Sequence, residues 1–178
     1  RYEEAVLYAV YKSSLLIQKF IFGVGKIMDF DSDSYFEGFL IQKNFLYHLI
    51  SYREIMAIID CLPGEREFWV YTCDSHIKNA ALAWCMVFGA DSNETHWKKI
   101  FKSNHEEARK AFLSYLYDTK QITEDIFHQY WKEITDFRNN YVAHQAGYNQ
   151  PVPYFDMACT ILFCFDIWIR EVEPDIDC

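Results

Sequence analysis

Apolar residues recur at three- and four-residue steps along almost the whole chain, which is the period of one face of an α-helix. The first segment with this period extends from about residue 3 to residue 29. A polar break with the sequence Asp-Ser-Asp-Ser, at residues 31–34, offers several candidate N-cap side chains. The next periodic segment begins near Phe36 and stops at the Leu-Pro-Gly sequence of residues 62–64, the clearest turn signal in the chain. We therefore expect two long helices in this part of the chain.

Two further helices are expected in the middle of the chain. One extends from about residue 65 to residue 89 and is most apolar at residues 80–88. A polar loop and a short helical turn at residues 96–101 follow it. The Ser-x-x-Glu sequence at residues 103–106 has the form of a capping box, so it predicts the start of a helix that ends near Asp118.

The last third of the chain predicts two more helices. Thr123 is a candidate N-cap for a helix that ends near Ala146, and Gly147 stands where a C′ residue would terminate it. The final helix extends from Tyr154 to about Val172. No alternating strand pattern of useful length appears. We therefore expect a single all-α domain over all 178 residues, a bundle of about five or six helices.

Two stretches are apolar on most sides, at residues 80–88 and 157–165. A helix of this kind needs cover on most sides. Either both helices lie in the core, or one of them covers an exposed side by forming a homodimer. Both stretches are far shorter than the ~20 apolar residues that span a bilayer, so no membrane association is expected.

The composition excludes several classes of protein. The chain has 19% aromatic residues and only 6 glycines, which excludes a disordered or linker-like chain. The 6 cysteines include no C-x-x-C sequence, several lie in apolar stretches, and no signal-peptide pattern is visible, so we expect free thiols and a cytoplasmic location. The net charge of −9 argues against a protein that coats nucleic acid non-specifically.

One segment departs from the acidic balance, because residues 96–110 carry a net charge of +3. Within it Trp97 has the chemistry to stack a base, and Lys98, Lys99 and Lys102 have the chemistry to hold phosphates. These four residues are the candidate RNA-binding set. The alternative is a solvated helix face, with Trp97 anchoring the loop to the core.

The sequence contains no recognisable metal or cofactor motif. None of the 6 histidines follows a Glu by three positions, and the H-E-x-x-H sequence is absent. The glycine-rich sequences that cradle phosphate groups and the Gly-x-Ser-x-Gly sequence of serine hydrolases are absent too. We therefore expect no metal site and no cofactor.

The candidate catalytic residues lie in the second half of the helix expected before Gly147, and they are Arg138, Asn139 and His144. A His side chain with a pKa near ~6.5 takes a proton from a ribose 2′-hydroxyl or gives one to the leaving 5′-oxygen. An Arg fork binds the phosphate and stabilises the charge that develops on it. No metal is required when the 2′-hydroxyl itself is the nucleophile.

Both charged residues also have structural explanations. His144 lies in the expected last turn of a helix, where a His side chain caps carbonyl groups, and Arg138 is able to pair with an acidic residue of another helix. On a straight α-helix, six steps turn by roughly 600°, which leaves the two side chains about 120° apart. They reach one phosphate only if the helix ends between them, or if a second copy completes the site across a twofold axis.

The segment from Arg138 to His144 resembles the R-x(4–6)-H motif of the HEPN superfamily, in which a polar residue commonly follows the Arg. Residues 82–101, which include Val-Phe-Gly and His-Trp sequences, further resemble the abortive-infection branch. The resemblance implies a dimeric all-α bundle and a metal-independent endoribonuclease of defence or toxin–antitoxin type. It also implies that Arg138, Asn139 and His144 of both protomers form the catalytic set. An antitoxin-like protein is instead the candidate partner of the alternative function, a non-catalytic interaction module.

Two other classes of function remain open from the residues. A non-catalytic all-α module for dimerisation or interaction fits the acidic balance and the apolar last helix, and some HEPN domains are binding modules of this kind. A small-molecule sensor with an aromatic pocket fits the aromatic content, but nothing in the sequence selects a ligand.

Overall fold

A computed structural model describes residues 29–120, 122–143 and 151–174. The helix expected from residue 3 to residue 29 lies almost wholly outside the described residues, as do the predicted terminator Gly147 and the catalytic candidate His144.

The described part of the chain is helical and contains no strand, which confirms the all-α prediction. A single antiparallel bridge joins Phe30 to Phe101. Among the described residues there are five α-helices and three short helical turns. They are α2 (Ser32–Ile58), η1 (Ile59–Cys61), α3 (Arg66–Phe88), η2 (Trp97–Ile100), α4 (His105–Lys120), α5 (Glu124–Phe137), η3 (Arg138–Ala143) and α6 (Phe155–Val172).

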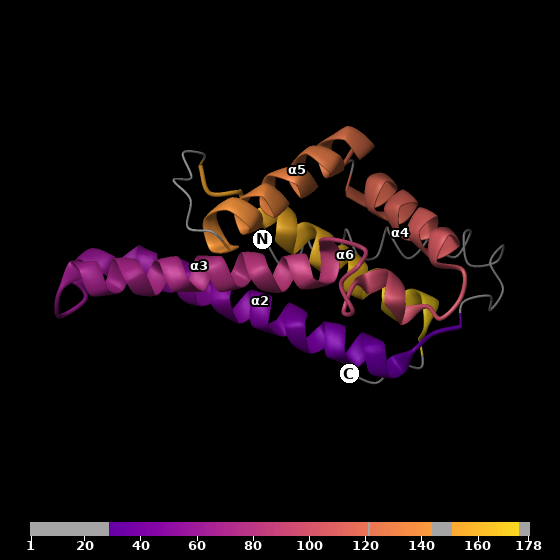
Figure 1. Cartoon of the computed structure of the whole chain (residues 1–178), viewed down its shortest axis with the longest axis horizontal. Coiled ribbons are helices and arrows are strands. Elements are labelled where there is room, and N and C mark those ends of the chain that lie inside the picture. Colours follow the sequence, from indigo (N-terminus) through magenta and orange to yellow (C-terminus); the bar gives the residue numbers. More distant parts are fainter. Residues whose placement is uncertain (1–28, 121, 144–150, 175–178) are drawn as a thin grey trace, which may run out of the picture.

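The helices form a long hairpin with three shorter helices packed against one end of it (Figure 1). α2 and α3 lie side by side along most of their length, and the turn between them projects beyond the rest of the molecule. α5 and η3 pack on α3, while α6 contacts α4 and α2. The chain reverses at Gly64, whose φ of +91° is a backbone conformation that glycine adopts without strain.

Local capping chemistry explains where two helices begin. Asp31 is the N-cap of α2, and its carboxylate accepts hydrogen bonds from the backbone N–H groups of Asp33 and Ser34 at 3.2 and 3.5 Å. Thr123 is the N-cap of α5, and its hydroxyl oxygen accepts from the backbone N–H of Ile126 at 3.3 Å. The Thr123 cap confirms the sequence prediction, and Asp31 is the one of the several candidates at residues 31–34 that acts as the cap.

The capping box expected at residues 103–106 is wrong by one residue. α4 begins at His105, and the carbonyl of Asn104 accepts the first helical bond, from the N–H of Ala108 at 3.0 Å. Asn104 therefore occupies the N-cap position, with a φ of 61°. Asn tolerates this left-handed conformation better than most residues, so it takes the cap that the Ser-x-x-Glu pattern assigned to Ser103.

Both of the strongly apolar helices lie in one hydrophobic core, so neither needs a partner to bury most of its apolar side chains. In α3 the buried side chains gather in the second half, and in α6 they extend from the first turn to the last. Aromatic rings of four elements meet in this core. They are Phe88 of α3, Trp97 of η2, Phe112 of α4, and Phe165 and Trp168 of α6.

The described cysteines are free thiols, as expected: Cys61, Cys73, Cys85, Cys159 and Cys164. Cys178 lies outside the described residues. Within the described part, none of the helices is long and apolar enough to span a membrane.

Replacement by alanine is expected to change the free energy of unfolding in opposite directions at two glycines. A Cβ atom at Gly89 would stand 2.2 Å from the backbone carbonyl oxygen of Cys85, so Gly89→Ala is expected to lower the free energy of unfolding by about 2 kcal/mol. Gly38 lies inside α2, and no atom of the described residues outside that helix's own backbone stands within 4 Å of such a Cβ, so Gly38→Ala is expected to raise it by about 0.5–1 kcal/mol. Urea unfolding of both variants measures the difference, and a loss for Gly38→Ala would contradict the packing described.

Candidate functional site

The segment that carries the catalytic candidates differs from the regular α-helix expected there. α5 ends at Phe137, and the chain continues as a π-helical turn over Arg138–Ala143. π-helical turns are rare and frequently occur at functional sites. The α-helical spacing used to relate Arg138 to His144 therefore does not apply from Arg138 onward. His144 itself lies outside the described residues.

Arg138 is half-buried and is the first residue of η3, which packs on α3. Its Nε is buried without a hydrogen-bond partner among the described residues. Burial raises the pKa of the neighbouring Cys85 thiol to about 11, and the charge and hydrogen bonding of Arg138 act in the opposite direction. Within the described part of the chain Arg138 forms no ion pair, so no described carboxylate neutralises the guanidinium. Asn139, the next candidate, is exposed.

Tyr141 attaches the π-helical turn to α3. Its hydroxyl donates a hydrogen bond of 2.6 Å to Asp74, whose second carboxylate oxygen lies 2.6 Å from the ammonium of Lys78. Lys78 also stands 4.6 Å from the centre of the Tyr141 ring, a cation–π contact. The hydrogen bond to Asp74 is the largest influence that raises the pKa of Tyr141 to about 12. These contacts hold the segment that begins with Arg138 in one position on α3.

The candidate RNA-binding residues differ widely in their exposure to solvent. Trp97 is only 6% exposed, and its ring contacts core aromatic rings of α4 and α6, as the alternative interpretation expected. Lys98 has an 11% exposed side chain and is paired with Asp91. Lys102 lies 3.9 Å from Asp31, and Lys99 is half-buried.

His96 is a buried polar residue that lies beside the candidate RNA-binding set but does not belong to it. It is 2% exposed, its Nδ1 accepts a 3.3 Å hydrogen bond from the backbone N–H of Lys98, and its Nε2 lies 3.4 Å from a carboxylate oxygen of Asp91. Because Nδ1 is an acceptor, the ring is neutral with its proton on Nε2. Burial lowers the pKa of His96 to about 4. The negative charge of Asp91 acts in the opposite direction, whereas the positive charges of Lys98, Lys99 and Arg109 lower this pKa further.

This arrangement predicts acid destabilisation that depends on His96. The unfolded chain binds a proton at His96 below pH ~6.5, whereas the folded protein does so only near pH 4, so stability is lost as the pH falls between these values. The expected loss is about 3 kcal/mol, since each pH unit in this window costs about 1.4 kcal/mol.

Urea unfolding between pH 7.5 and 4.5 measures this loss. In the control variant His96→Asn, the side chain keeps an acceptor for the N–H of Lys98 but does not titrate. The variant is expected to show a flatter pH dependence than the wild type. An equal pH dependence of the free energy of unfolding in the two proteins would show that other groups cause the loss of stability at acidic pH.

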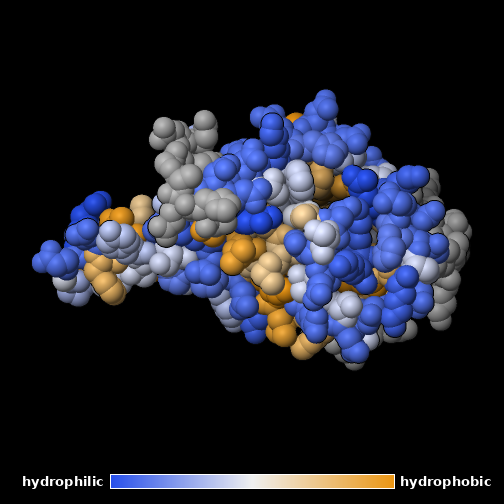
Figure 2. Space-filling model, viewed as in Figure 1, coloured by the Kyte–Doolittle hydropathy of each residue, from blue (hydrophilic) through white to orange (hydrophobic). Residues whose placement is uncertain are grey.

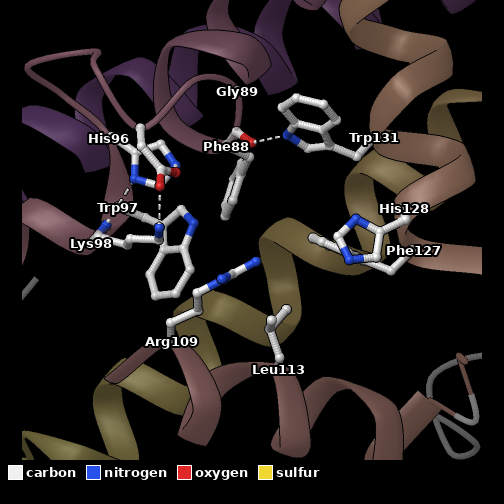
Figure 3. A pocket seen from close by; sticks show the side chains of 11 residues that line it. Phe88, Gly89, His96, Trp97, Lys98, Arg109, Leu113, Phe127, His128 and Trp131 are labelled. Carbon is white, nitrogen blue, oxygen red and sulfur yellow. Dashed lines mark hydrogen bonds and ion pairs between the residues drawn. The ribbon is translucent and has the colours of Figure 1, made fainter. Parts of the chain in front are cut away.

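His96 forms one wall of an open pocket of about 170 Å³ (Figure 3). Arg109 extends into the pocket from α4, and the opposite wall consists of α5 side chains. Trp131 of α5 donates a 2.9 Å hydrogen bond from its indole N–H to the carbonyl of Phe88, which fixes α5 against the end of α3. The complete lining is Phe88, Gly89, Asp91, His96, Trp97, Lys98, Arg109, Leu113, Phe127, His128 and Trp131.

The described side chains include no group of three or more His, Cys, Asp or Glu residues that could hold a metal ion. Two separate features therefore stand out: the π-helical turn that begins with Arg138, and the pocket that Arg109 enters. Comparison with known proteins adds nothing to either, since no protein-family model, no curated protein and no solved structure matches this chain.

Proposed function

We propose that this protein is a homodimeric, metal-independent endoribonuclease of the kind that the HEPN resemblance implies, acting in the cytoplasm in a defence or toxin–antitoxin system. His144 is the general acid and base, Arg138 binds the scissile phosphate, and Asn139 orients that phosphate by hydrogen bonding. The ribose 2′-oxygen loses its proton and bonds to phosphorus, while the bond to the 5′-oxygen breaks and that oxygen takes up a proton. The products are a 2′,3′-cyclic phosphate and a 5′-hydroxyl.

The observation that carries this proposal is the state of Arg138. A half-buried guanidinium with a buried, unpaired Nε and no described carboxylate partner retains its capacity for an anion. A purely structural Arg in such a place is normally paired, because an unsatisfied buried donor costs free energy. Its location at the first residue of a π-helical turn supports the same conclusion.

The projecting hairpin supports dimerisation through this part of the molecule. Large apolar side chains are exposed on α2 and α3 towards the hairpin turn, and Figure 2 shows apolar residues on this projecting end. Tyr71, which is 63% exposed, is one helical turn from Asp74, the partner of Tyr141 in η3. We expect a twofold contact that extends along α3 from Tyr71 to Asp74 to bring the two η3 segments towards each other. The exposed apolar residues of this region are Tyr47, Ile50, Met56, Ile58, Phe68, Val70 and Tyr71.

Incubation of single-stranded RNA with the purified protein in EDTA tests the proposal. We expect cleavage that continues without divalent metal and leaves fragments with 2′,3′-cyclic phosphate ends, identified by mass spectrometry. An RNA with 2′-O-methyl riboses is the control, because it lacks the nucleophile and is expected to stay intact. Cleavage only with added metal, or fragments with 3′-hydroxyl ends, would contradict the mechanism.

The exposed hairpin also favours a second candidate, a non-catalytic interaction module that binds a protein partner through the same apolar side chains. The two candidates differ in one outcome. Phe68→Glu is expected to disrupt the dimer or complex of either candidate. An interaction module, however, leaves RNA intact under every condition.

A further inference from the structure

We infer that the pocket between η2, α4 and α5 binds one nucleotide unit, with its base against Phe127 and Trp131 and its phosphate on Arg109. The inference rests on the proposed ribonuclease function, for which it assigns a substrate subsite beside the catalytic segment. None of these three residues belongs to the RNA-binding set expected from the sequence.

Arg109 supplies the anion-binding group. Among the described residues it makes a single ion pair, 3.9 Å from Glu106, and that carboxylate is mostly exposed. A contact of this length in water is weak, so most of the five guanidinium donors stay open. Figure 3 shows the side chain extending from α4 into the pocket rather than along its own helix. A guanidinium held in this way binds phosphate with charge-assisted hydrogen bonds.

The charges around Arg109 leave the pocket positive. Lys98 is paired with Asp91, so these two charges offset each other. His96 is neutral because burial lowers its pKa to about 4. Among the described lining residues, Arg109 therefore adds a positive charge beyond the Asp91–Lys98 pair, and its weak contact with the mostly exposed Glu106 leaves a pocket that favours an anion.

The aromatic side chains suit a base. Phe127 and Trp131 are half-buried, line the pocket from one face of α5, and are one helical turn apart. The volume of about 170 Å³ is close to the ~150 Å³ of a cavity that holds one benzene ring, so it accommodates a single base with the phosphate at the open mouth. Stacking of a base on such rings contributes roughly 1–3 kcal/mol whatever the base.

The pocket and Arg138 lie about two helical turns apart, on the side of α5 that faces α3. Trp131 and Arg138 are seven residues apart, or about two helical turns and roughly 10 Å along the axis. Trp131 bonds to Phe88 of α3 and Arg138 neighbours Cys85 of α3, so both face the same helix. A short oligonucleotide that enters the pocket is able to extend along α5 to the catalytic segment.

Calorimetric titration with AMP tests the pocket, and it requires no cleavage. We expect the wild type to bind AMP at least tenfold more tightly than adenosine, because adenosine lacks the phosphate that Arg109 holds. Arg109→Gln is expected to weaken AMP binding at least tenfold and to leave adenosine binding unchanged. Lys110→Gln is the matched control, since it removes the same charge from an exposed neighbour on α4 and is expected to change AMP binding less than twofold.

A second titration distinguishes an RNA phosphate from a free nucleotide. A single-stranded oligonucleotide is titrated into His144→Ala protein, which is not expected to cleave it, with and without Arg109→Gln. A tenfold loss of affinity on adding Arg109→Gln supports the subsite. Loss of AMP binding alone would overturn the subsite and identify a free nucleotide as the ligand, and equal effects of Arg109→Gln and Lys110→Gln would overturn the pocket itself. Failure of the wild type to cleave RNA leaves the AMP result intact, so the two proposals fail separately.

Discussion

Replacing His144 by alanine is expected to lower the rate of RNA cleavage by roughly 10²–10⁴-fold, the range that a positioned general acid or base contributes. The imidazole is needed twice, because a proton leaves the 2′-oxygen and a proton reaches the 5′-oxygen in the same reaction. Single-turnover cleavage of a labelled oligonucleotide in EDTA measures the rate. Thermal unfolding of the variant shows whether the fold survives. Unchanged cleavage by a folded His144→Ala protein would falsify the assignment.

Arg138 variants separate charge from geometry at the same site. Arg138→Lys keeps the positive charge but loses the planar fork, so we expect it to recover only a small part of the activity that Arg138→Ala loses. Asn140→Ala is the control, because Asn140 is an exposed neighbour in η3 that lies outside the catalytic set. Full activity of Arg138→Lys would reduce the role of this side chain to a point charge. Equal losses for Arg138→Ala and Asn140→Ala would indicate a general distortion of η3.

The helices were predictable because apolar period and capping chemistry act locally. Thr123 begins α5 where the sequence predicts, α2 begins at one of the candidate caps of residues 31–34, and the Leu-Pro-Gly turn separates α2 from α3. The error at α4 has the same local origin, since Ser103 and Asn104 are adjacent candidates for one cap and the sequence pattern favours the wrong one. Backbone geometry decides between them, since Asn104 has a φ of 61° and its carbonyl accepts the first helical bond.

The candidate site was less predictable because tertiary packing creates it. Residues that form a π-helical turn are not distinguished by period or composition from an α-helix, so the change at Arg138 has no signal in the sequence. The pocket joins His96, Arg109 and Trp131 from three elements, and each of them alone looks like an ordinary surface or core residue. The +3 charge of residues 96–110 singled out this segment, but within it Trp97 is buried and Arg109 has the more accessible side chain.

Replacing Phe165 by alanine is expected to lower the free energy of unfolding by about 4 kcal/mol, within the range for a buried Phe that leaves a cavity. The ring is 1% exposed and meets the rings of Phe88, Trp97, Phe112 and Trp168 at centroid distances of 5.3–6.1 Å. Four neighbours cannot all move into the space, so most of the cavity remains and the contacts are lost.

Phe163→Ala is the matched control for this variant, because Phe163 lies on the same helix with a 49% exposed side chain and is expected to change stability by less than 1 kcal/mol. Urea unfolding at pH 7.5 gives both values. Phe88 and Trp97 also line the pocket, so Phe165→Ala is expected to weaken AMP binding as well, whereas Phe163→Ala is not. Similar stability losses for the two variants would mean that Phe165 does not lie at the centre of the aromatic core. A stability loss for Phe165→Ala without weaker AMP binding would separate the pocket from that core.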